Sequence, residues 1–375
     1  MGALPADDST PSAPALALWL LPEQAPLARA VAAEAGVRIA AAGSPVRGQS
    51  GAVATDLGCA TLDDLRGALT GAAPGAAGEC DAVLILAPGD FGRAADADVR
   101  DLEAARERGR TVLTTEPVPA SALDVAAPAW RREGLDIRPE ELCRPAAMLR
   151  HTRPWRDATD AIATFGPVRA VVVECFGSPA DCTLGAHLFS ALDVVQSVLG
   201  EAETIHASFV PPGFVAGVHS SPGDTLRDLR GDATANLRFP DGRCAAIVAS
   251  DHAGRFNRCA TLLGPAGRLR VYDDGFEWSG PSGEKTDELR LRRERAGEPT
   301  PSAAPRSLFD SAPPTLPTPH NVLQLADAVR RALDPGLRDA PVDFGTVLTM
   351  AGALLLSAKT GEKESPATIR RMAAG

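Results

Sequence analysis

Short apolar runs alternate with helix-length stretches through the first 114 residues, and this alternation limits the fold more than any other feature. Continuous apolar runs of strand length are typical of strands that are covered on both faces. They occur at Ala15–Leu21, Val37–Ala42, Ala82–Ala87 and Arg110–Thr114. Helices are predicted between them at Pro26–Ala35, at Thr61–Leu69 with Thr61 as its cap, and at Asp96–Arg108. This order predicts an α/β domain with a doubly wound, Rossmann-type parallel sheet.

The pattern changes beyond residue 120, where strands follow one another with few helices between them. Strands are predicted at Val168–Glu174, Thr204–Phe209, Ala233–Phe239, Arg243–Ser250, Ala260–Leu263 and Arg268–Tyr272. Asp241 and Gly242 form a hairpin signal between two of these strands. Helices are predicted over Arg144–Ala163, broken at Pro154, and over Asn321–Leu333 and Phe344–Lys359. Consecutive strands with tight turns predict a separate α+β domain with a large, mostly antiparallel sheet.

These patterns divide the chain into three parts. We expect a flexible tail at residues 1–14, a Rossmann-type domain at residues 15–120 and the α+β domain at residues 121–375. Residues 280–319 are rich in charge, proline and serine and are expected to form a long loop. A length of 375 residues is too great for one ordinary core, which agrees with two domains.

The stretch Thr183–Gly200 (TLGAHLFSALDVVQSVLG) is the clearest helix in the second domain. Its apolar residues from Leu184 to Leu199 recur at steps of three and four, which places them on one helix face. Thr183 and His187 stand four residues apart and share a second face, although Thr183 is also a plausible cap. A polar pair beside a buried face is a candidate site.

Composition excludes several classes of partner. The net charge is -10 and there is no strongly basic stretch, so nucleic acid is not expected as a partner. The seven cysteines are scattered without a CxxC pair, which favours a reducing compartment and argues against a zinc site. Residues 1–14 lack the basic start of a signal peptide, and Ala15–Leu21 is too short to span a membrane. A cytoplasmic protein that does not bind membranes is expected.

The first turn of the Rossmann-type domain lacks the residues that usually hold a dinucleotide. Sheets of this kind bind a phosphate at the N-terminus of the first helix, where glycines allow close approach. Here the turn reads LPEQAP (Leu21–Pro26), with two prolines, Glu23 and no glycine. Proline removes N–H donors, and Glu23 adds a negative charge where a pyrophosphate would lie. The second strand ends in Gly43, Ser44 and Pro45, without an acid to bind a ribose. The turn predicts weak or absent binding of NAD or NADP.

Four stretches together give the chain a resemblance to a known family. They are DAVLILAP (Asp81–Pro88), VLTTEPVP (Val112–Pro119), the Thr183–Gly200 helix, and a C-terminal half containing LRFPDG, LLGPAG and LLLSAKTGEKESP. The chain resembles the Gfo/Idh/MocA oxidoreductases, the group of glucose–fructose oxidoreductase and inositol dehydrogenase. The resemblance implies a Rossmann domain followed by an α+β domain whose open sheet often forms a dimer interface. It also implies NAD or NADP as cofactor and a sugar, cyclitol or similar hydroxylated substrate.

The resemblance also assigns site residues, several of which depart from the family pattern. The family's Glu-Lys-Pro is replaced by Thr115-Glu116-Pro117, and its Asp-x-Gly-x-His by Thr183, Gly185 and His187. The implied catalytic residues are His187, Glu116 and Thr183, with His187 as the acid/base because histidine titrates near neutral pH. The implied cofactor-binding residues are Pro22, Glu23, Ser44, Ala87, Pro88, Glu116 and Pro117. No metal ligand is expected. The family's lysine is missing, and the first 284 residues contain no lysine.

The resemblance predicts an oxidoreductase as the class of function, and the missing lysine and glycines favour two alternatives. The predicted reaction is NAD(P)-dependent oxidation or reduction of a sugar, cyclitol or polyol. The first alternative is a non-redox binding or scaffold subunit, either a homo-oligomer formed through the C-terminal sheet or a hetero-oligomer with an active paralogue. The second alternative is an isomerase or lyase that uses Glu116 and His187 as an acid/base pair.

Overall fold

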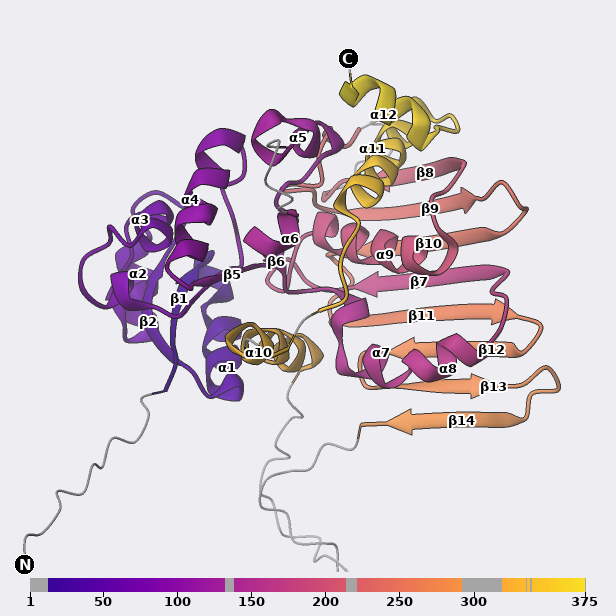
Figure 1. The fold of residues 1–375 in the computed structure, drawn as a ribbon, viewed down its shortest axis with the longest axis horizontal. Coiled ribbons are helices and arrows are strands. Elements are labelled where there is room, and N and C mark those ends of the chain that lie inside the picture. Colours follow the sequence, from indigo (N-terminus) through magenta and orange to yellow (C-terminus); the bar gives the residue numbers. More distant parts are fainter. Residues whose placement is uncertain are drawn as a thin grey trace, which may run out of the picture.

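The computed structural model describes residues 13–131, 138–213, 221–291, 319–334, 336–337 and 339–374. Two domains, each built around its own sheet, lie side by side in Figure 1. Helix α10 (His320–Leu333) lies between them, although it comes from the C-terminal part of the chain. Most of the predicted N-terminal tail, residues 1–12, lies outside the described residues.

The first domain contains a six-stranded parallel sheet in the order β3-β2-β1-β4-β5-β6. Its strands are β1 (Ala15–Trp19), β2 (Arg38–Gly43), β3 (Ala60–Thr61), β4 (Ala82–Ile85), β5 (Thr111–Thr114) and β6 (Arg144–Pro145). The strand order reverses between β1 and β4, which is where doubly wound sheets bind ligands. This arrangement confirms the predicted fold class of the first domain. The boundary at residue 120 stays a prediction, and β6 joins the first sheet from beyond it.

Helices cover both faces of this sheet because its strands are apolar on both sides. The helices of this domain are α1 (Ala25–Ala35), α2 (Ser50–Leu57), α3 (Leu65–Thr70), α4 (Ala95–Glu107) and α6 (Pro139–Leu142). One face of β1 and β4, with Leu16, Leu18 and Leu84, packs against α1 and α10 in one core. The other face packs against α3 and α4, where Leu69 and Leu102 are fully buried. The C-terminal helix α10 is therefore part of the first domain's core.

The second domain contains an eight-stranded sheet in the order β14-β13-β12-β11-β7-β10-β9-β8. Its strands are β7 (Ala170–Phe176), β8 (Thr204–Val210), β9 (Asp232–Arg238), β10 (Cys244–Ser250), β11 (Asn257–Gly264), β12 (Gly267–Tyr272), β13 (Gly275–Ser279) and β14 (Lys285–Arg290). All neighbours are antiparallel except β7 and β10. The mostly antiparallel sheet of the second domain is confirmed.

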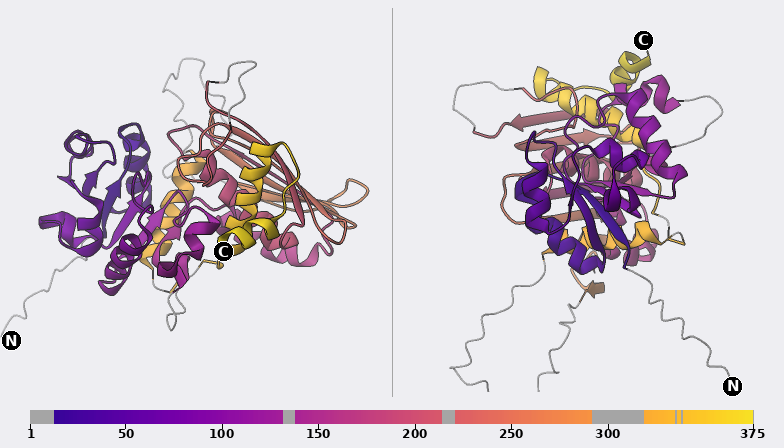
Figure 2. Two further views of the ribbon diagram at one scale, coloured as in Figure 1. Left: turned by 90° about the horizontal axis from the view of Figure 1, so that it is seen from above. Right: turned by 90° about the vertical axis from the view of Figure 1, so that its left-hand side faces the viewer.

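Helices pack on one face of the second sheet, as the view from above in Figure 2 shows. The helices outside the first domain are α5 (Ala122–Ala126), α7 (Arg153–Asp157), α8 (Thr159–Thr164), α9 (Leu184–Leu199), α11 (Phe344–Thr360) and α12 (Pro366–Ala374). Alternate residues of β7, namely Val171, Val173 and Cys175, are buried beneath them. The residues between these point to the opposite face of the sheet.

The structure corrects three local predictions. Thr61 is in β3, and α3 is capped instead by Asp64, whose carboxylate accepts a hydrogen bond from the Arg66 N–H. Arg144–Ala163 is not one broken helix, because Pro154 lies in the first turn of α7, where a missing N–H is tolerated. Residues 280–319 are not entirely a loop, since β14 pairs with β13, and residues 292–318 lie outside the described residues.

Candidate functional site

Helix α9 carries His187 into the junction between the two domains. The helix begins after Thr183, whose hydroxyl accepts a hydrogen bond from the Ala186 N–H at 3.2 Å, so this side chain acts as a cap. A Cβ at Gly185 would lie 1.8 Å from the Leu226 carbonyl oxygen, so only glycine allows the backbone this close. The motif predicted at this position therefore fixes the start of α9.

His187 is fully buried and uncharged. Its Nε2 lies 3.4 Å from the Cys182 Sγ, and the Phe256 ring packs against the imidazole with centroids 5.9 Å apart. Burial, and then the nearby Arg258 guanidinium, lower the pKa of His187 to about 3, while burial raises the pKa of the Cys182 thiol. The thiol therefore keeps its proton and can donate it to the neutral Nε2. With its ring nitrogen occupied in this way, His187 is a weak base.

Glu116 follows β5 and is buried in the same junction, with 3% of its surface exposed. Its Oε2 accepts a hydrogen bond from the Asp228 N–H at 3.2 Å. Burial raises the pKa of Glu116 to about 7, because the hydrogen bond from Asp228 and the charges of Arg230 and Arg227 compensate only part of the lost solvation. This carboxyl group carries a proton for much of the time at neutral pH.

A small cavity lies beside these two groups, although neither of them lines it. Thr115, next to Glu116, and Cys182, next to His187, line one cavity of about 10 Å³ together with Asn321 and Gln324 of α10. A cavity of this size is close to the minimum for one water molecule. The structure therefore brings the two predicted catalytic residues to one junction, but this cavity has no room for a sugar.

A loop of the second domain contacts both the first domain and Glu116. We call residues 224–230 the closing segment; its Arg227 donates to the Phe91 and Gly92 carbonyl oxygens of the first domain. Asp228 forms an ion pair with Arg93 at 3.1 Å and has a left-handed backbone, with φ of 53°. These contacts join the loop after β4 directly to the neighbourhood of Glu116.

The first turn of the Rossmann-type sheet satisfies its own backbone donors. The Gln24 N–H donates to the Leu21 carbonyl at 2.9 Å, and the Ala25 N–H donates to Pro22. The Leu21 N–H donates to the Gln24 side chain, also at 2.9 Å. Pro22 and Pro26 have no N–H, so this turn offers few of the donors that hold a pyrophosphate.

Two loops also meet above the end of β1, where a dinucleotide would cross the sheet. A Cβ at Gly89, after β4, would lie 2.4 Å from the Cβ of Pro45, after β2. Ser44 is turned inward, since its hydroxyl accepts from the Val46 N–H at 3.2 Å. The residues present do not fit a dinucleotide held in the usual mode.

The predicted cofactor-binding residues are thus divided between two environments. Pro22 and Glu23 are exposed at the first turn, whereas Ser44, Ala87, Pro88, Glu116 and Pro117 are buried. Their role in binding stays a prediction. Within the described ranges, His, Cys, Asp and Glu side chains form no group of three that could hold a metal ion. No helix in the part of the chain that the structure describes has the length and apolar character needed to cross a membrane.

Sequence reasoning missed the residues that shape the junction most. Arg227 and Asp228 lie in a polar stretch without any motif, and Arg258 lies within a strand. Their contacts join segments that are 15 to 136 residues apart. Only Cys182 could have been found, because it precedes the recognised helix by one residue.

Comparison of the sequence with protein-family models and with curated proteins gives no match. Solved structures with a similar fold include an NAD binding oxidoreductase from Klebsiella pneumoniae (15% identity, 94% of this chain and 99% of that chain, TM-score 0.59). They also include scyllo-inositol dehydrogenase from Lactobacillus casei (14%, 95% and 99%, TM-score 0.56). A third is the WlbA dehydrogenase from Bordetella pertussis, in complex with NADH and UDP-GlcNAcA (14%, 94% and 98%, TM-score 0.54). The chain therefore shares the two-domain fold of these solved oxidoreductase and dehydrogenase structures.

Proposed function

We propose that this chain is a non-redox subunit with a dehydrogenase fold, which assembles with a second copy of itself through the open face of its eight-stranded sheet. The observation that carries the proposal is the closed junction between the domains. The Arg227 guanidinium binds the loop after β4, and the Asp228 N–H binds Glu116; we infer that a nicotinamide ring would have to displace these bonds to approach His187. Each lost bond would leave a buried polar group without a partner.

The first prediction is that the natural protein shows no saturable binding of NADH or NADPH at micromolar concentrations. One reason is that the N–H groups of the first turn are already bonded within the turn. The other is the carboxyl group of Glu116, which stands where the resemblance places a lysine. Calorimetric titration of the full chain measures this, beside a Glu116→Lys variant that restores the cation. Glu107→Gln is the matched control, because it removes an exposed carboxylate at the end of α4, outside both the first turn and the junction. Micromolar binding by the natural protein would contradict the proposal.

The open face of the second sheet has the character of a protein interface. Val248 on β10 and Leu263 on β11 are 37% and 38% exposed and lie on strands that flank β7. Val172, on β7, pairs with Ala246 of β10, and both are half-buried on the same face. Polar and charged residues lie on the outer strands of this face, such as Arg268 on β12. Glu174 of β7 pairs with Val248 on this face, so its centre combines exposed apolar side chains with a carboxylate, a mixture that subunit interfaces tolerate.

The second prediction is that Val248→Asp converts a dimer into a monomer. The substitution places a second carboxylate beside Glu174 at the centre of this face, where the partner would have to bury two like charges. Light scattering coupled to size-exclusion chromatography measures the mass. Leu123→Asp is the control, because Leu123 is an exposed apolar residue on α5, 59% exposed and away from the sheet. A natural protein that is monomeric at all concentrations would contradict the assembly.

Redox chemistry on a sugar, cyclitol or related hydroxylated compound is the second candidate, and the place of His187 favours it. The histidine lies at the start of α9 in the junction where the two domains meet. Solved proteins of the same fold are named as dehydrogenases, one of them in complex with NADH and UDP-GlcNAcA. Under this candidate, or as the base of an isomerase or lyase, His187 must first release its Nε2 from Cys182. The titration with NADH and NADPH distinguishes this redox function from the proposed non-redox subunit, because only the redox function requires the cofactor to bind.

A further inference from the structure

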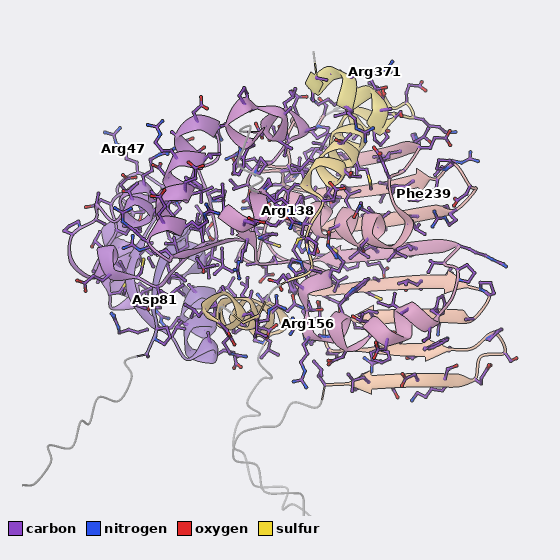
Figure 3. The ribbon with its side chains drawn as sticks, viewed as in Figure 1. Arg47, Asp81, Arg138, Arg156, Phe239 and Arg371 are labelled. Carbon is purple, nitrogen blue, oxygen red and sulfur yellow. The ribbon has the colours of Figure 1, made fainter. Side chains whose placement is uncertain are left out.

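The closing segment has two anchors in the second domain and a polar tip that contacts the first domain. Leu226 and Leu229 are the anchors, since both are buried in the core of the second domain. Between them lie Arg227 and Asp228, which we call the tip; they bind the loop after β4 and Glu116. Figure 3 shows side chains from both domains filling the region where the domains meet. The tip therefore holds the two domains together at one point of this region.

Several features of the tip favour its release or hold it only weakly. The ion pair of Asp228 with Arg93 joins side chains that are 54% and 58% exposed, and exposed pairs contribute little to stability. Asp228 also has a left-handed backbone, with φ of 53°, which is unfavourable for residues other than glycine. Release would exchange the ion pair for water and relieve this strain. It would break the hydrogen bonds of Arg227 and of the Asp228 N–H, while both leucine anchors stay buried.

The hydrogen bond from Asp228 links the position of the tip to the charge of Glu116. While the Asp228 N–H binds its Oε2 at 3.2 Å, Glu116 is 3% exposed. An ionised carboxylate loses much of its hydration in such a place and regains it once water can enter. Burial accordingly raises the pKa of Glu116 from 4.5 to about 7 with the tip in place. The closed junction favours the proton, and an open junction favours the ion.

Glu116 is the group whose charge changes here near neutral pH. The closing segment acts on it through three charged side chains: Asp228, Arg230 and Arg227. Arginine side chains keep their charge throughout. On the side of α9, burial, and then Arg258, lower the pKa of His187 to about 3, and burial raises the pKa of the Cys182 thiol. His187 and Cys182 therefore both stay neutral between pH 5 and pH 8.

We propose that the tip is a clasp between the two domains, which opens when Glu116 loses its proton. The closed form binds this proton more tightly, so opening becomes more favourable as pH rises from 4.5 and levels off above about 7. Between pH 6 and pH 8 the opening equilibrium should rise about tenfold. The clasp rests on the closed junction of the proposed function. Titration with NADH tests that function, whereas the clasp is tested by amide exchange, so the two can fail separately.

Hydrogen–deuterium exchange of the full chain, resolved to single residues by fragmentation, measures opening of the clasp. The Asp228 amide is the reporter, because it exchanges only after its bond to Glu116 has broken. Its protection, corrected for the intrinsic exchange rate at each pH, should fall about tenfold between pH 6 and pH 8. The Leu226 amide, which donates to the Ala120 carbonyl at 3.1 Å, is the internal control and should keep its protection. A parallel fall at Leu226 would mean that the whole segment unfolds, and would contradict a clasp with fixed anchors.

Two variants assign the effect to the proposed groups. Glu116→Gln keeps an acceptor for the Asp228 N–H and cannot ionise, so protection at Asp228 should be equal at pH 6 and pH 8. Arg227→Gln removes the guanidinium that binds the loop after β4, and should lower protection at pH 6 about tenfold.

The matched controls are Glu107→Gln and Arg29→Gln, which remove an exposed carboxylate on α4 and an exposed guanidinium on α1. Both should exchange like the natural protein, and circular dichroism confirms that every variant is folded. The proposal is overturned if Asp228 is equally protected at pH 6 and pH 8 in the natural protein, or if Glu116→Gln shows the same fall. Unchanged protection in Arg227→Gln would likewise show that the tip does not hold the domains together.

Discussion

Arg258→Met is expected to lower the free energy of unfolding by about 3–5 kcal/mol, the usual cost of breaking a buried ion pair by removing one partner. Arg258 and Asp273 are both almost fully buried, with side chains 1% and 2% exposed. The Arg258 Nε lies 3.2 Å from Asp273 Oδ1, and the Arg258 backbone N–H donates to Oδ2 at 2.7 Å. Without the guanidinium, the Asp273 carboxylate would be left buried with its main charged partner missing.

The loss should be large because Arg258 also connects the two domains. Its guanidinium donates to the Ala147 carbonyl and to the Gln324 side chain of α10, and it lies 5.0 Å from the Phe256 ring centroid. Phe256 in turn packs against His187, so Arg258 also supports the candidate site through Phe256. Methionine fills part of the space but supplies none of these donors.

Urea denaturation followed by circular dichroism measures this loss, with two comparisons. Arg29→Met breaks an exposed ion pair with Asp56, whose side chains are 52% and 56% exposed, and should cost less than about 1 kcal/mol. The double variant Arg258→Met/Asp273→Leu removes both charges and should recover much of the lost stability, because no buried charge remains. If Arg258→Met cost no more than Arg29→Met, the guanidinium would not be holding the domains together.

The two sheets could be predicted from the sequence because their signals are local. The apolar runs of β1, β4 and β5 are consecutive residues, and a strand buried on both faces needs nothing more. Helix α9 was predicted with both ends correct, since Thr183 caps it and Gly200 ends it within the same short stretch. Strand β14 was missed because its residues, KTDELR, are charged and pair only through the backbone at a sheet edge.

The candidate site could be predicted only in part, because its closure depends on contacts between distant segments. His187 and Glu116 were found through motifs, and their burial follows from the packing of both domains. The hydrogen bond from Asp228 to Glu116 joins residues 112 apart in the chain. It also requires a left-handed Asp228, a conformation that no residue pattern around it predicts. The local signs that the junction differs from a dinucleotide site were the glycine-free first turn, the missing acid after β2 and Glu116 in place of a lysine.

Glu116→Gln is expected to make the stability of the protein less dependent on pH. Burial raises the pKa of Glu116 from 4.5 to about 7 in the folded protein, so the folded chain binds this proton more tightly than the unfolded chain. Between these two values the folded state carries more protons, and stability therefore falls as pH rises. The contribution of the protonated carboxyl is fully present below pH 4.5 and is lost as pH rises through about 7.

The size of the effect follows from the pKa shift. At about 1.4 kcal/mol for each pKa unit, the buried carboxylate costs roughly 3 kcal/mol once it is ionised. Glutamine stays uncharged, and its carbonyl oxygen can still accept the hydrogen bond from the Asp228 N–H. The variant should therefore have nearly the stability of the natural protein at about pH 4 and be more stable by up to roughly 3 kcal/mol at about pH 8.

Urea denaturation of both proteins across this pH range measures the difference in their free energies of unfolding. Glu23→Gln is the matched control, because Glu23 is exposed and its variant should follow the natural protein at every pH. A Glu116→Gln variant that is less stable than the natural protein at about pH 8 would mean that the carboxylate is needed there as an ion. Glu116 would then be stabilised by Arg227 and Arg230 in a more open junction. That result would contradict the closed junction between the domains, on which the proposed non-redox function depends.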